Sequence, residues 1–159
     1  MDNSIYYEDK IVKLVAQRGA APPPWFMFRG IHLSSICWRM GAGEFYIIIF
    51  FTWWKEQKES LDESQRIEYF RKWPPPPLWL TWMIEVIWDL DPEDFDDDDD
   101  YWPYFRRTKA LGFGGENDYK SQERMGRDER RGRVTNAGDS ALKRLNGVKG
   151  FTNRGSGRG

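Results

Sequence analysis

The chain has 159 residues, a formal net charge of −1, nine tryptophans, one histidine and one cysteine. This length suits one domain, and a single cysteine excludes an internal disulfide. The sequence up to Gly114 is acidic and contains every tryptophan, whereas the remainder is basic and rich in glycine. We therefore predict a mainly α fold: a small single-domain helical bundle with Pro-rich connections over residues 1–114, and a disordered basic C-terminal tail over residues 115–159.

The first predicted element is an amphipathic helix over Ser4–Gln17, with Ser4 as N-cap and Gly19 as the stop. Its apolar residues recur at helical spacing: Tyr7, Ile11, Leu14 and Val15. The following Ala20–Trp25 stretch is expected to run extended, as polyproline II.

Three further helices are predicted along the aromatic part of the chain. The isoleucines of residues 47–49 favour a strand, but the segment Glu44–Lys58 is too long for one and has no hairpin signal nearby. Ser60 and Glu63 form a capping-box pattern that opens a helix to about Lys72. The prolines of residues 74–77 end it, and Leu78–Leu90 forms the next helix, apolar on two faces.

Several kinds of catalytic or cofactor site are excluded because the residues that they require are missing from the sequence. Zinc sites need about four close ligands, but His32 and Cys37 are the only histidine and cysteine. The Gly41–Glu44 stretch lacks the third glycine and the preceding strand of a nucleotide fingerprint. The aspartate run lacks the alternating spacing of a calcium loop. We predict a protein without metal or cofactor that is not an enzyme.

The first candidate site is the segment Trp38–Glu44. We expect Arg39, in apolar company, to need a partner, with Glu44 or backbone carbonyls as the candidates. One interpretation is a structural clamp that pins the loop onto the next helix. The alternative is a small-ligand or anion pocket. Its residues would be Trp38, Arg39, Gly41, Gly43 and Glu44.

This segment also carries a resemblance. From Pro22 to about Trp79, the chain is similar to a group of uncharacterised bacterial proteins. They have a Pro-Pro-Trp entry, a Ser-Ile-Gly-Trp-Arg-Met-Gly-x-Gly-Glu core and a Trp-rich helix. The matching residues here are Ile36, Trp38, Arg39, Met40, Gly41, Gly43 and Glu44, with Cys37 where the pattern has glycine. The resemblance implies that this segment belongs to a genuine domain, and it implies no activity.

The second candidate site is an acidic-aromatic junction. Its carboxylates repel one another and belong in water, whereas the aromatic residues that follow favour burial. It is either a solvated loop whose rings fold back onto the core, or a partner-binding surface that steers a basic protein. The candidate residues are Asp96, Asp97, Asp98, Asp99, Asp100, Tyr101, Trp102, Tyr104 and Phe105.

The third candidate site is the basic tail, which either contacts the phosphates of a nucleic acid or only solubilises the chain. Its residues include Arg124, Arg127, Arg130, Arg131, Arg133, Lys143 and Arg144. A short helix is expected around Ala141–Leu145.

The leading functional hypothesis is a non-enzymatic macromolecule-binding protein, an adaptor, inhibitor or accessory subunit with a protein partner at the acidic-aromatic surface. The alternatives are a nucleic-acid-associated accessory protein and a pocket around Arg39 and Glu44. The longest apolar run, residues 45–51, is too short to span a membrane. We expect a cytoplasmic protein.

Overall fold

The computed structural model describes residues 3–147, with side chains described as far as Gly132. The chain divides between Tyr119 and Lys120 into two units. Every regular element of the described residues is helical, which confirms the mainly α prediction. The helices are α1 (Ser4–Arg18), α2 (Pro24–Met27), η1 (Ile36–Trp38), α3 (Ala42–Lys58), α4 (Glu63–Lys72), η2 (Pro77–Trp79), α5 (Leu80–Trp88), η3 (Pro92–Asp94), η4 (Asp98–Tyr101), α6 (Trp102–Ala110) and α7 (Glu116–Gly147).

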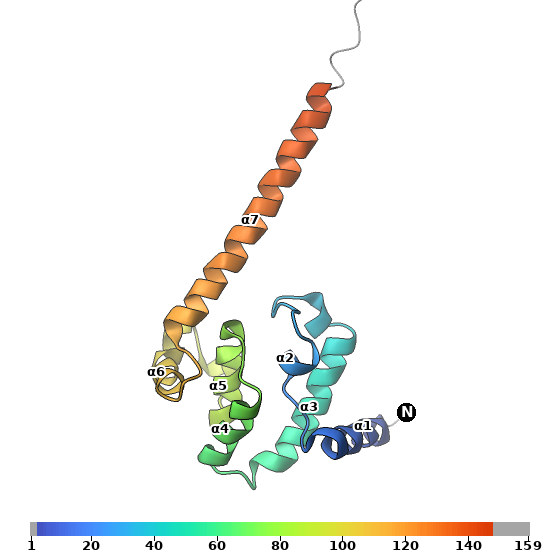
Figure 1. Cartoon of the computed structure of the whole chain (residues 1–159), viewed down its shortest axis with the longest axis vertical. Helices are drawn as coiled ribbons and strands as arrows, with labels where there is room; N and C mark the ends of the chain where they lie inside the picture. The colour runs from blue at the N-terminus through green and yellow to red at the C-terminus, as the bar shows by residue number, and fades with distance from the viewer. Residues whose placement is uncertain (1–2, 148–159) are drawn as a thin grey trace, which may run out of the picture. The chain divides into compact units, whose positions relative to one another are not determined.

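Helix α3 packs against α1, α2 and η1, while α5 packs against α4 and α6 (Figure 1). The core between them is unusually rich in aromatic rings. Fully buried Phe50 contacts the rings of Trp54 and Trp82, at centroid distances of 5.8 and 5.1 Å. Within residues 3–147, no helix combines the length and the apolar character that crossing a bilayer requires.

The two proline-tryptophan segments meet inside this core. The prolines of residues 22–24 are fully buried, and the rings of Trp25 and Trp79 lie 5.6 Å apart. The Trp25 indole donates to the carbonyl of Trp73 at 3.0 Å. The extended conformation ends earlier than predicted, because α2 begins at Pro24, and proline is well suited to the first position of a helix.

The cap of α4 differs from the predicted one. Asp62, not Ser60, is the N-cap, and it forms a capping box with Gln65 in which both reciprocal bonds are present. Ser60 instead donates its hydroxyl to the carbonyl of Gln57 at the end of α3. Two residue pairs in this stretch, Ser60 with Glu63 and Asp62 with Gln65, fit the capping pattern, and the structure uses the second.

Arg66 joins the ends of two helices. Its guanidinium donates to the carbonyl of Lys58 at 2.7 Å and to that of Ile87 at 2.9 Å, and its Nε donates to Leu61. The carbonyls of Lys58 and Ile87 lie in the last turns of α3 and α5, where intrahelical donors are lacking, and that of Leu61 lies in the α3–α4 connection. A residue that the sequence leaves unremarkable is therefore a shared C-terminal cap.

Helix α7 begins well before the short helix expected around Ala141–Leu145 and is longer than it. The stretch lacks proline, contains many strong helix formers and pairs Glu123 with Arg127 one turn apart. None of its described side chains, up to Gly132, is fully buried, as expected for a segment with few apolar residues. The remainder of the predicted tail, from residue 148, lies outside the described residues.

Candidate functional site

The acidic stretch of the junction forms two short helical turns held by its own carboxylates. Asp91 accepts from the backbone N–H of Glu93 at the start of η3. Asp97 accepts from the N–H of Asp99, and Asp100 accepts from the N–H of Asp96. The side chains of residues 96–100 are exposed. The carboxylates are therefore presented to solvent on a hydrogen-bonded turn.

The aromatic residues of the junction divide between core and surface. Tyr101 and Phe105 are buried, and Tyr104 is half-buried against Trp88. Trp102, at the first position of α6, remains 47% exposed. Of the four aromatic residues proposed to bind a partner, Trp102 alone is classed as exposed.

Tyr101 fixes this junction to the core. Its ring stacks on Phe95 with centroids 4.4 Å apart, and its hydroxyl donates to Oε1 of Glu85 on α5 at 2.5 Å. Burial raises the pKa of Glu85, the hydrogen bond from Tyr101 lowers it, and the charge of Asp91 raises it further. A carboxylate on α5 therefore anchors the acidic turn at an electrostatic cost.

We expect the Glu85→Gln variant to be stabilised more at about pH 7 than at about pH 4. Folding raises the pKa of Glu85, so the protonated carboxyl is favoured in the folded state. The resulting contribution to folding stability is fully present in acid, below the unfolded-state pKa, and is lost as the pH rises through the folded-state pKa. Glutamine keeps an oxygen for Tyr101 and removes the charge. Urea unfolding followed by tryptophan fluorescence at both pH values measures the difference. Glu93→Gln, an exposed acid in η3, is the control, and equal gains for both variants would contradict the prediction.

The segment Trp38–Glu44 is placed differently from expectation. Arg39 and Glu44 are both exposed, and no ion pair joins them in the part of the chain that the structure describes. The expected burial of Arg39 is wrong, because η1 turns that side chain outward while Trp38 turns inward. The loop is nevertheless held to the next helix, by packing instead of by charge.

Two residues of the segment carry this packing. The Trp38 indole donates to the carbonyl of His32 at 2.9 Å, and its ring contacts Trp79 at 5.0 Å. Gly43, in the first turn of α3, lies so close to Cys37 that a Cβ there would be 2.6 Å from the Cys37 carbonyl oxygen. Gly41 has a φ of +102°, with no neighbour near the Cβ position. These contacts fit the structural clamp, with Gly43 as its tightest point.

The described basic residues of α7 do not form a uniformly positive face. From Glu116 to Gly132 there are five acidic and five basic residues. Arg124, Arg127, Arg130 and Arg131 are exposed, Arg127 pairs with Glu123, and Arg130 donates to the carbonyl of Gly126. The side chains of Arg133, Lys143 and Arg144 lie outside the described ones.

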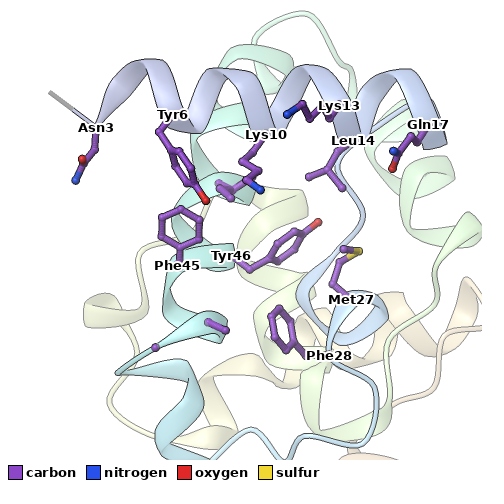
Figure 2. A pocket seen from close by; sticks show the side chains of 13 residues that line it. Asn3, Tyr6, Lys10, Lys13, Leu14, Gln17, Met27, Phe28, Phe45 and Tyr46 are labelled. Carbon is purple, nitrogen blue, oxygen red and sulfur yellow. The ribbon is translucent and has the colours of Figure 1, made fainter.

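The structure adds a site that sequence reasoning missed. An open groove of about 980 Å³ lies between α1 and the start of α3, with α2 at its floor (Figure 2). Its only charged lining residues are Lys10 and Lys13. The spacing of these lysines along one side of α1 was visible in the sequence. The aromatic floor that they face was not, since it comes from other helices.

Metal chemistry finds no support in the described residues, where no cluster of histidine, cysteine and acidic side chains could hold an ion. His32 is exposed, and its ring forms a hydrogen bond with the Ser34 hydroxyl. Within the described residues, no hydrogen bond joins His32 to Cys37. No protein-family model matches the chain, and neither a curated protein nor a solved structure shows significant similarity to it.

Proposed function

We propose that this chain is a non-enzymatic protein-binding module, an adaptor or inhibitor, that takes a cationic segment of a protein partner. The proposed binding surface consists of the acidic turn, residues 94–100, and Trp102. The observation that carries the proposal is the partly exposed indole of Trp102, which directly follows in sequence a turn whose exposed carboxylates are held by hydrogen bonds to its own backbone. Such a surface combines an aromatic anchor with charges that steer a basic partner.

The local geometry supports recognition of arginine or lysine. The Arg106 guanidinium already lies 4.8 Å from the centroid of the Trp102 ring, so this indole accepts a cation on one face. Because Tyr101 and Phe105 are buried, the surface is held on the core and loses little conformational entropy on binding. A cytoplasmic location, where basic protein segments are common, is part of the same proposal.

The test uses a nona-arginine peptide as probe, titrated calorimetrically into the full chain. Trp102→Ala is expected to weaken binding about tenfold or more, because it removes the anchor. The triple variant Asp96→Asn, Asp98→Asn, Asp99→Asn keeps the capping residues Asp97 and Asp100. It is expected to weaken binding at low salt and to flatten its salt dependence.

Met40→Ala is the matched control, since Met40 is also a large exposed apolar side chain, 69% accessible and remote in sequence from the turn. It should leave the affinity unchanged. The proposal is wrong if Trp102→Ala binds the peptide as the original chain does. It is also wrong if a single-stranded oligonucleotide binds more tightly than the peptide and loses affinity when residues 120–159 are removed; that result would select the nucleic-acid alternative.

A further inference from the structure

The groove between α1 and α3 has the composition of a ligand site. Its floor is apolar, and three of the six side chains that form it are aromatic: Leu14, Met27, Phe28, Phe45, Tyr46 and Ile49. Its volume, about 980 Å³, lies at the upper end of the range for small-molecule pockets, about 300–1,000 Å³. The Tyr46 hydroxyl is already used, because it donates to the carbonyl of Pro22 at 2.6 Å. The floor therefore offers contact surface to an apolar chain.

The charge at this groove has one sign. Lys10 and Lys13 are three residues apart on the same face of α1, and the lining includes no aspartate or glutamate. Neither lysine forms an ion pair with a residue that the structure describes; the Lys10 amine lies 5.3 Å from the centroid of the Tyr6 ring. In Figure 2 the Lys10 side chain descends from α1 toward Tyr46. Two ammonium groups thus stand at the edge of an apolar floor.

We propose that this groove binds a small amphiphilic carboxylate, with an aliphatic chain along the aromatic floor and the carboxylate beside Lys10 and Lys13. Both halves of such a ligand gain from the site. The chain leaves water for an apolar surface, and the carboxylate finds two cations that lack a fixed acidic partner. The site is separate from the acidic turn and Trp102, so this inference does not depend on the proposed function.

The experiment titrates dodecanoate, below its micelle concentration, into the full chain with labelled methyl groups. Binding is expected to shift the methyl signals of Met27, Leu14 and Ile49, which line the groove. The methyl signal of Met83, which is fully buried and does not line the groove, should not move. Butyrate, which keeps the head group without the chain, should bind at least tenfold more weakly. Dodecyltrimethylammonium, which reverses the charge, should also bind more weakly than dodecanoate.

The double variant Lys10→Gln, Lys13→Gln is expected to weaken dodecanoate binding about fivefold to tenfold, since each exposed charge contributes modestly. Lys55→Gln, an exposed lysine on α3 outside the groove, is the matched control and should bind as the original chain does. Three results would overturn the proposal: methyl shifts away from the groove, equal affinity for dodecyltrimethylammonium, or unchanged affinity in the double variant. If the methyl signals of the groove residues shift with protein concentration in the absence of ligand, the groove binds a second copy of the chain. That result would also overturn the proposal.

Discussion

Trp38→Ala is expected to lower the free energy of unfolding by about 3–5 kcal/mol, as for other large aromatic residues truncated in a core. Trp38 is 8% exposed, and its ring packs edge-on against Trp79 at 5.0 Å and against Phe28 at 5.6 Å. Alanine leaves a cavity between η1, α2 and η2 and removes the indole donor to the His32 carbonyl. Urea unfolding followed by the remaining tryptophans measures the loss.

Two variants show whether this loss is specific. Ile36→Ala alters the same 3₁₀ helix at a side chain that is 64% exposed, and it should change stability by no more than about 0.5 kcal/mol. Trp38→Phe keeps an aromatic ring and should fall between the two. If Trp38→Ala unfolds at the urea concentration of the original chain, Trp38 is not a core residue, and the interpretation of residues 38–44 as a small-ligand or anion pocket is favoured instead.

Gly43→Val is expected to destabilise the fold by about 3 kcal/mol or more, at the upper end of the range for overpacked sites. A Cβ at this position would lie 2.6 Å from the Cys37 carbonyl oxygen and 2.8 Å from its Sγ. The oxygen belongs to the backbone, so relief requires η1 to move away from α3. Thermal and urea unfolding, with circular dichroism as a check of helix content, measure the effect.

The neighbouring positions separate crowding from backbone strain. Ala42→Val adds comparable bulk one residue earlier, on an exposed side, and should cost only about 0.5 kcal/mol from helix propensity. Gly41→Ala should cost about 1–3 kcal/mol through its φ of +102° alone, because nothing lies within 4 Å of its Cβ position. A Gly43→Val variant no less stable than Ala42→Val would contradict the close approach of η1 and α3.

The candidate sites show how far residue patterns reach. The sequence located the acidic junction, and its carboxylates are exposed as like-charge repulsion demands. The sequence could not show which of the four aromatic residues that follow these carboxylates are buried. Whether a side chain on η4 or α6 points into the core or into solvent is decided only when these helices pack against α5. Buried Tyr101 donates its hydroxyl to Glu85, and these residues are sixteen positions apart.

The same limit explains Arg39 and the groove. An arginine between tryptophan and methionine suggests burial, but a short 3₁₀ turn directs adjacent side chains to opposite sides, and Arg39 lies outside while Trp38 lies inside. The groove depends on α1, α2 and α3 together, so no single segment carries its pattern.

The sequence by itself determined the helical class, α1 with its Gly19 stop, and the helical state of α3. These features follow from local periodicity, capping and length, which act over a few neighbouring residues. Tertiary structure alone decided that Arg66 would cap α3 and α5, that Gly43 would touch Cys37, and that two lysines would face an aromatic floor. Each of these depends on contacts between distant segments, and burial and hydrogen bonding across such contacts select one arrangement among many that the local pattern permits.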